Sequence, residues 1–337
     1  MTRVLVIDPH APDAGAVNEA ARVLRGGGLV ALPTETVYGL AACALDESAV
    51  GRVFLAKGRP SSHPLIAHVL GEEDAQGLAR SWPDRAHRLA AAFWPGPLTL
   101  VVDRASGGPI AVSGGGDSIA VRAPAHPVAR AVIRALGQPV AAPSANRYQG
   151  LSPTTASHVL RELGDSVELV LDAGPCEAGI ESTVVDVRGS QPCLLRPGAI
   201  DLRALRAVMA DVSRGEAAAL IRDQLRPSPG MQARHYSPRA ILRVARDRDS
   251  AEALAASLSA EGEYVGLLVR GPLSKPASPR VESRQLAQDP KAFAHSLFAT
   301  LHDLDALGVN AIVVEDVPGE DEWLAVADRL TRAACPR

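Results

Sequence analysis

The sequence predicts an α/β protein with a mixed sheet, followed by a second, smaller α/β domain. Short apolar segments alternate with helical patterns up to residue 209, and the alternation resumes after a proline-rich stretch at 210–239. The steps mix β-α-β units with hairpin-like connections, which does not fit a regular barrel. The 337 residues suffice for about two domains. We therefore expect a first domain over 1–209, a linker over 210–239 and a second domain over 240–337.

Local signals place the elements of the first domain. Residues 13–26 carry apolar positions at helical spacing and end in glycines, which stop a helix. Asp46 caps a second helix, which we expect to end near Lys57 because Gly58 follows. Further helices are expected at 84–93, 127–136, 154–163 and 201–209. Short apolar runs predict strands at 29–32, 64–70, 97–103, 118–123, 139–142, 168–172, 182–187 and 192–196.

The stretch from 210 to 239 differs from its surroundings. It contains Pro227, Pro229 and Pro238, and proline precludes a long helix. We interpret this stretch as a linker or lid. Beyond it, the pattern predicts strands at 241–245, 264–269, 280–286 and 311–316 and helices at 250–260, 290–307 and 321–334.

Composition excludes several classes of protein. Hydrophobic residues make up 47% of the chain and charged residues 22%, as in a folded globular protein. No apolar run approaches the ~18 residues that a membrane span requires, and the N-terminus lacks a signal-peptide pattern. We expect a cytoplasmic protein without membrane contact. The net charge of -3 argues against a broad nucleic-acid surface. The four cysteines are far apart, and no metal ligands are assigned.

Polar side chains follow the strand expected at 29–32. Thr34, Glu35 and Thr36 come directly after its carboxyl end, where ligands of open α/β sheets usually bind. The alternative is a helix start, with Thr34 or Thr36 as the N-cap and Glu35 in the first turn. The sequence of this segment alone favours the helix start.

Lys57 and Arg59 form a candidate anion site. Lysine is rare in this chain: three of the 35 basic residues are lysines, so a retained lysine suggests a need for a compact point charge. Two cations in a tight Gly/Pro turn can converge on one anion. The alternative is that they complement the negative end of the preceding helix.

Other polar residues at strand ends have competing interpretations. Arg122 can clamp a carboxylate or pair with an acid of its own domain. His68 alone is more often a core histidine than a ligand. Ser144 and Asn146 are good neutral donors and equally good turn formers. Ser182 and Arg196 flank apolar strands, and His235 and Tyr236 belong either to a lid or to a simple spacer.

The motifs of several common enzymes are absent. The chain has no phosphate loop, no dinucleotide-binding glycine pattern and no serine-nucleophile elbow. Clusters of Thr, Ser, Arg and Lys without a nucleophile suit chemistry by positioning and charge stabilisation, as in nucleotidyl or phosphoryl transfer.

Taken together, nine segments resemble the Sua5/YrdC family in order and spacing over residues 16–238. These segments are LPTETVYGL, AKGRP, HPLIAHV, FWPGPLTLVV, IAVRAPAHP, APSAN, IESTVVDV, LLRPG and ARHYSP. The trailing residues resemble the long, two-domain Sua5 form. The resemblance implies a YrdC-like twisted, open mixed sheet with helices, followed by a Rossmann-like domain.

The resemblance also implies an activity, threonylcarbamoyl-AMP synthesis from L-threonine, bicarbonate or CO2, and ATP with Mg2+. A downstream transferase would use the product to modify position 37 of tRNAs, so tRNA would be contacted at most indirectly. Lys57 and Arg59 match the family's K-x-R pair and would be catalytic contacts to the phosphates. Further nucleotide-site positions would be His63, Ser118, Ser144, Asn146, Ser152, Arg196, His235 and Tyr236. The threonine pocket would comprise Thr36, His68, Arg122, Ser182 and, through its backbone, Ala142.

Two other functions remain open at this point. An RNA-binding module of YrdC type would show salt-sensitive tRNA binding without ATP. A carbamoyl-transfer enzyme would need acylphosphatase and zinc-finger segments, which this sequence lacks.

Overall fold

The computed structural model describes residues 1–215, 234–272 and 278–336. The chain divides into two compact units, Met1–Tyr148 with Pro153–Met231, and Gln149–Ser152 with Gln232–Arg337. Much of the linker predicted at 210–239 lies outside the described residues. The boundaries 1–209, 210–239 and 240–337 therefore stay a prediction.

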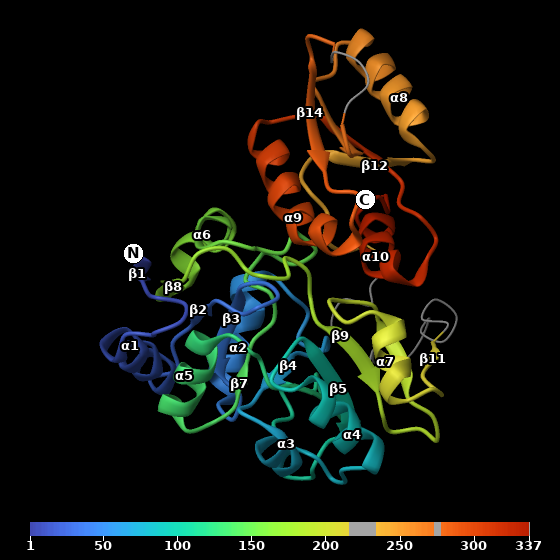
Figure 1. Ribbon diagram of the computed structural model, residues 1–337. Helices are drawn as coiled ribbons and strands as arrows, with labels where there is room; N and C mark the ends of the chain where they lie inside the picture. The colour runs from blue at the N-terminus through green and yellow to red at the C-terminus, as the bar shows by residue number, and fades with distance from the viewer. Residues whose placement is uncertain (216–233, 273–277, 337) are drawn as a thin grey trace. The chain divides into compact units, whose positions relative to one another are not determined.

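The first unit is built on one eleven-stranded mixed sheet, in the order β1-β8-β2-β3-β7-β4-β6-β5-β9-β10-β11 (Figure 1). The sheet combines parallel pairs such as β4–β6 with antiparallel pairs such as β5–β6. The predicted α/β class with a mixed sheet is confirmed. The strands are β1 (Arg3–Val6), β2 (Val30–Leu32), β3 (Gly39–Cys43), β4 (Ile66–His68), β5 (Leu98–Asp103), β6 (Ser118–Arg122), β7 (Val140–Ala141), β8 (Leu169–Asp172), β9 (Thr183–Asp186), β10 (Cys193–Arg196) and β11 (Ser213–Arg214).

Several helices of the first unit begin at a side-chain cap and end at a glycine. Asp46 accepts a hydrogen bond from the Ala49 amide at the start of α2, and Gly58 ends that helix in the left-handed conformation, with φ 64°. Buried residues of α1 and α5 share one apolar core with β2 and β8. The helices are α1 (Ala14–Arg25), α2 (Glu47–Lys57), α3 (Glu72–Leu78), α4 (Asp84–Phe93), α5 (Pro127–Leu136), α6 (Ala156–Leu163) and α7 (Leu202–Val208), with a short 3-10 turn, η1 (Gly164–Ser166).

Some features of the first unit differ from the prediction. β1, β3, α3 and β11 were not predicted from the sequence. The helix start considered at Thr34 is wrong: residues 33–38 form an irregular turn that leads into β3. The Thr34 hydroxyl caps this turn instead, because it accepts hydrogen bonds from the amides of Thr36 and Val37.

The second unit contains a four-stranded parallel sheet in the order β12-β15-β13-β14. Its two central strands are buried and rich in Val, Leu and Ile, as expected for a parallel sheet covered by helices, whereas the two edge strands are partly exposed. The elements are β12 (Ile241–Ala245), α8 (Arg248–Ala260), β13 (Val265–Arg270), β14 (Val281–Leu286), α9 (Pro290–Ala306), β15 (Ala311–Glu315), η2 (Asp321–Trp323) and α10 (Leu324–Ala333).

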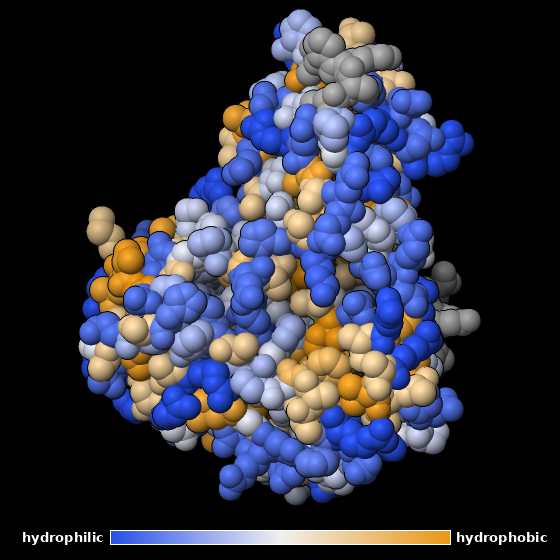
Figure 2. Space-filling model, in the orientation of Figure 1, coloured by the Kyte–Doolittle hydropathy of each residue, from blue (hydrophilic) through white to orange (hydrophobic). Residues whose placement is uncertain are grey.

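Hydrophilic residues cover much of the visible surface of the molecule, with smaller apolar areas between them (Figure 2). Within the described ranges, every helix is too short or too polar to cross a membrane.

Candidate active site

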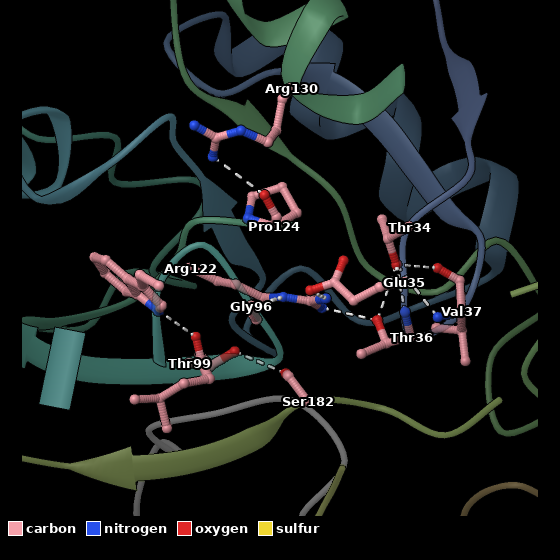
Figure 3. A network of polar contacts seen from close by, with 12 residues as sticks. Thr34, Glu35, Thr36, Val37, Gly96, Thr99, Arg122, Pro124, Arg130 and Ser182 are labelled. Carbon is pink, nitrogen blue, oxygen red and sulfur yellow. Dashed lines mark hydrogen bonds and ion pairs between the residues drawn. The ribbon is translucent and has the colours of Figure 1, made fainter. Parts of the chain in front are cut away.

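Arg122, at the end of β6, is the centre of a buried polar network. Its Nη2 lies 2.7 Å from Oε1 of Glu35, and both side chains are almost fully buried, with 4% and 8% of their surface exposed. Its Nη1 donates to the Thr36 hydroxyl at 2.9 Å, and its Nε donates to the Gly96 carbonyl at 3.3 Å. Three groups from two loops therefore hold the guanidinium in one orientation, and Figure 3 shows it pointing toward Glu35 and Thr36.

The turn that carries Glu35 is itself fixed by hydroxyl groups. The Thr34 hydroxyl lies 2.9 Å from that of Thr36 and donates to the Val37 carbonyl at 2.6 Å. The backbone oxygen of Glu35 accepts a hydrogen bond from the Ala178 amide at 2.7 Å. Because both sides of the turn are tied, Thr36 and Glu35 present their side chains to Arg122 in a defined geometry.

Ser182 lies next to this network, between two strands. Its hydroxyl is 2.7 Å from that of Thr99 and accepts a hydrogen bond from Nη2 of Arg196 at 3.0 Å. Nη2 of Arg196 also donates to the Ser182 carbonyl at 2.8 Å. A Cβ on Gly198 would lie 2.4 Å from the backbone of Ser182, so only glycine permits this close approach. Arg196 is thus fixed as a support for Ser182.

Lys57, the last residue of α2, links this helix to the loop that follows β7. Its side chain is 3% exposed, and Nζ donates to the carbonyls of Ser144 at 2.5 Å and Asn146 at 2.6 Å. The Asn146 Oδ1 is a third acceptor at 3.5 Å. An ammonium group has three donors, and all three have acceptors in the Ser144–Asn146 loop. Burial lowers the pKa of Lys57 well below its usual value, and the nearby Arg59 lowers it further.

Arg59 and His63 gather around Tyr148. The Arg59 guanidinium lies 5.8 Å from the centre of the Tyr148 ring, and its Nη2 donates to the Pro64 carbonyl at 3.0 Å. The Tyr148 hydroxyl is 3.2 Å from Nδ1 of His63. The amide of Tyr148 donates to the carbonyl of Lys57, so this aromatic residue connects the K-x-R turn to the loop after β7.

Strand register places some of the candidate residues at one end or the other of β4 and β6. β4 and β6 are parallel, with His68 opposite Arg122, so these two residues lie at the carboxyl ends of their strands. Ser118 begins β6, and His63 precedes β4. β7 runs antiparallel to β4, so the loop that follows β7 lies at the same amino end. We call Lys57, Arg59, His63, Ser118, Ser144 and Asn146 the lysine group, and Thr36, His68, Arg122, Thr99, Ser182 and Arg196 the arginine group. Thr36 belongs to the arginine group through its hydrogen bond with Arg122 and not through register, because Gly39, which follows it, pairs with Ser144.

The second half of the sheet explains why Ser182 belongs to the arginine group. β5 is antiparallel to β6 and parallel to β9, so the start of β9 lies at the same edge as the end of β6. Ser182 immediately precedes β9, and Arg196 ends the antiparallel β10 beside it. Ala142 follows β7, where its amide donates to the Ile66 carbonyl at 3.1 Å.

Burial determines the charge states of the arginine group. Burial, together with the charge of Arg122, lowers the pKa of His68 to about 3, so its imidazole is neutral at pH 7. Burial alone would raise the pKa of Glu35, but the Arg122 guanidinium outweighs this effect and lowers it, so the carboxylate is ionised. Burial raises the pKa of the Cys176 thiol far above neutrality.

Ser152, His235 and Tyr236 belong to the second unit. The Tyr236 ring is 1% exposed and lies 4.8 Å from the guanidinium of Arg329, which is fully buried on α10. The rings of His235 and Tyr236 are 4.0 Å apart, and the His235 amide donates to the Arg332 carbonyl at 3.3 Å. The Ser152 carbonyl lies 3.2 Å from Nε2 of His302. This unit therefore holds the H-Y-S-P segment through its own residues.

The described residues include no group of three or more His, Cys, Asp and Glu side chains that could hold a metal ion. Glu35 is committed to Arg122.

The structure thus brings together most residues that the sequence singled out, in two groups of the first unit. Sequence reasoning missed the supporting residues. Thr99 lies inside an apolar strand, and the only signal in the sequence is its hydroxyl within the run LTLVV. Glu35 was noted only as one of several polar residues, and its pairing with Arg122 depends on residues far apart in the chain.

These features define an α/β protein with two buried polar networks on one mixed sheet, one centred on Arg122 and one on Lys57. A family model for Sua5, YciO and YrdC proteins, described as "Telomere recombination", matches residues 22–198. A second model, described as "Threonylcarbamoyl-AMP synthase, C-terminal domain", matches residues 200–335. The chain belongs to the Sua5/YrdC family, in the form that carries the C-terminal domain.

Known relatives agree over nearly the whole chain. The threonylcarbamoyl-AMP synthase of Pyrococcus abyssi is 40% identical over 320 residues, which cover 94% of this chain and 93% of the relative. That of Bacillus subtilis is 35% identical over 333 residues, covering 98% and 96%.

Two solved structures place the fold. The crystal structure of P. abyssi Sua5 complexed with L-threonine is 39% identical, with a TM-score of 0.93 and coverage of 99% of this chain and 98% of that one. The crystal structure of Escherichia coli YciO is 23% identical, with a TM-score of 0.56. The match covers 61% of this chain and 100% of the YciO chain, and it supports the fold alone.

Proposed function

We propose that this chain is a threonylcarbamoyl-AMP synthase, a nucleotidyltransferase. It condenses L-threonine, bicarbonate or CO2, and ATP to threonylcarbamoyl-AMP and pyrophosphate. Relatives that carry this name match the chain over almost its full length. The alternative of an RNA-binding module is not favoured.

One observation in this structure carries the proposal: His68 and Arg122 end the parallel strands β4 and β6, whereas the Ser144–Asn146 loop, which binds Lys57, lies at the amino ends of these strands. A three-residue strand such as β4 spans roughly 10 Å. That length suits a ligand with an amino-acid carboxylate at one end and a phosphate at the other. We assign the arginine group to L-threonine, with Arg122 facing its carboxylate, and the lysine group to the phosphates of ATP.

The chemistry needs no enzyme nucleophile. The uncharged amine of threonine attacks the carbon of CO2, a C–N bond forms, and the nitrogen releases a proton to give a carbamate. A carbamate oxygen then attacks the α-phosphorus of ATP, the bond to the β-phosphate oxygen breaks, and pyrophosphate leaves. The protein must hold two anions together and stabilise charge at the α-phosphate, which fixed cations and donors do well.

The residue roles in this proposal follow the two groups. Lys57 holds the Ser144–Asn146 loop in shape and lies with Arg59 at the phosphate end. His63 and Ser118 lie at the same end of the sheet. Arg196 supports Ser182 in the threonine pocket, although the family pattern had suggested a nucleotide contact. Ser152, His235 and Tyr236 are assigned to the nucleotide only through the family pattern.

Further parts of the proposal concern partners and location. Mg2+ enters with ATP, and bicarbonate supplies the carbamoyl carbon. A separate transferase consumes the adenylate to modify tRNA, so this chain contacts tRNA at most indirectly. We place the protein in the cytoplasm, and we assign residues 1–209 to catalysis and 240–337 to the Sua5 C-terminal domain.

The test is pyrophosphate release from ATP, with L-threonine and bicarbonate each omitted in turn. The proposal expects release only when both are present. Release that is indifferent to L-threonine would contradict it and would reduce the family match to a shared fold.

A further inference from the structure

The buried Glu35–Arg122 pair has a role beyond holding the arginine in place. We propose that Glu35 is a specificity-determining residue, which sets the charge of the Arg122 pocket so that it accepts a zwitterionic amino acid and rejects a simple carboxylate. This inference rests on the proposed function, because it takes the Arg122 pocket as the threonine site.

Glu35 is buried, so its charge rather than a direct contact would act on a ligand. Both of its carboxylate oxygens are inaccessible to solvent. Its partner is the Nη2 of Arg122 at 2.7 Å. Arg122 retains further N–H groups, because Thr36 and Gly96 each take one. In this proposal a substrate carboxylate binds these N–H groups and lies close to the charge of Glu35.

The charges around Glu35 sum to zero. The groups that sense its charge are Arg122, His68, His126 and Cys176. His68 and His126 have lowered pKa values, and Cys176 has a raised one, all through burial, so these three are neutral at pH 7. Arg122 and Glu35 remain as one positive and one negative charge.

A neutral pocket favours a neutral ligand. L-Threonine is a zwitterion, so its ammonium balances its carboxylate within the site. (R)-3-hydroxybutyrate is threonine without the amino group, and it brings one uncompensated negative charge next to Glu35. Like charges a few ångströms apart in a poorly solvated site repel strongly. Without Glu35, the pocket carries a net positive charge, and this discrimination should weaken.

The test compares the two ligands in Glu35→Gln and in the unaltered enzyme. The readouts are KM for L-threonine and Ki for (R)-3-hydroxybutyrate in threonine-dependent pyrophosphate release. We expect the ratio of Ki to KM to fall by about tenfold to a hundredfold in Glu35→Gln. Glu35→Asp keeps the charge and should keep the ratio. KM for ATP should stay within about twofold in both variants.

Matched controls separate charge from structure. Glu168→Gln removes a carboxylate that pairs with Arg52 at a partly exposed position of the same unit, and it should leave the ratio unchanged. An unchanged ratio in a folded, active Glu35→Gln overturns the inference. If that variant does not fold, the unaltered enzyme still tests the inference. Binding of (R)-3-hydroxybutyrate as tight as that of L-threonine would overturn the inference. Absence of threonine-dependent turnover in the unaltered enzyme would instead refute the proposed function.

Discussion

The ammonium group of Lys57 lies 2.6 Å from the backbone oxygen of Asn146, a residue 89 positions further along the chain. With the Ser144 carbonyl at 2.5 Å, this contact closes the loop after β7 onto the end of α2. The lysine thus acts first on the protein: it fixes a loop whose side chains we assign to the nucleotide. This role suits a compact cation with three donors, in a chain whose basic residues are mostly arginines.

Replacing Lys57 with methionine should abolish this tie while keeping the length of the side chain. We expect pyrophosphate release to fall by about two orders of magnitude, because the loop loses its charged donor and the phosphates lose a cation. Lys291→Met is the control, since Lys291 is exposed at the start of α9. Near-normal turnover in Lys57→Met would show that the loop holds its shape without the lysine.

The hydroxyl of Thr99 should matter through Ser182. Thr99→Val keeps the shape of a fully buried side chain but removes the 2.7 Å contact to the Ser182 hydroxyl. We expect a loss of about 1 kcal/mol in stability, and a rise of several-fold in KM for L-threonine with less change for ATP. Thermal unfolding and steady-state kinetics measure these effects. Thr300→Val removes a helical hydroxyl that bonds the Ser296 carbonyl, and serves as the control; equal effects of both changes on KM would argue against the pocket assignment.

His68 should make folding stability depend on pH. Its pKa is about 3 in the folded protein and 6.5 in the unfolded chain. Below pH 6.5 the unfolded state therefore binds a proton that the folded state does not, and stability falls as the pH drops. The full slope from this group is about 1.4 kcal/mol per pH unit. His126, whose pKa is also lowered, contributes with the same sign.

Denaturant unfolding between pH 6 and 5 measures that slope. His68→Gln should be less sensitive to pH than the unaltered protein, whereas His87→Gln, at an exposed position, should not be. An identical slope in all three proteins would mean that His68 is protonated in the folded state.

The buried Arg329 should hold Tyr236 in the second unit. A desolvated cation–π contact is worth about 2 kcal/mol. Arg329→Met should therefore speed hydrogen exchange of the His235 and Ser237 amides by roughly thirtyfold. These amides bond the carbonyls of Arg332 and Gln149. Arg243→Met, at an exposed position of β12, is the control; unchanged protection in Arg329→Met would assign the segment's order to its backbone bonds alone.

The spacing of apolar residues, together with the residues that cap or end helices, predicted most of the fold. The glycines after α1, the Asp46 cap and Gly58 are local signals, and local signals settle helix ends. β3 was not predicted because its sequence, GLAAC, lacks the β-branched and aromatic residues that are typical of strands. α3 escaped because its EEDAQGL sequence has few apolar positions.

The site residues could be predicted where a single residue matched a motif. They could not be predicted where the role of a residue depends on a partner far away in the sequence. Arg122 was left open between a carboxylate clamp and an internal ion pair. The structure shows the ion pair, with Glu35, and the clamp stays a prediction. Likewise Lys57 was expected at the phosphates, whereas the observed acceptors of its ammonium are in the Ser144–Asn146 loop. Such pairings depend on strand register, which no local pattern encodes.

The most direct test of the proposed activity is the fate of labelled carbon. The protein would be incubated with ATP, Mg2+, L-threonine and 13C-bicarbonate, and the nucleotide products analysed by mass spectrometry. The proposed activity predicts a threonine-containing adenylate that carries the label, formed together with pyrophosphate. Pyrophosphate or AMP formation without any labelled, threonine-containing adenylate would contradict it.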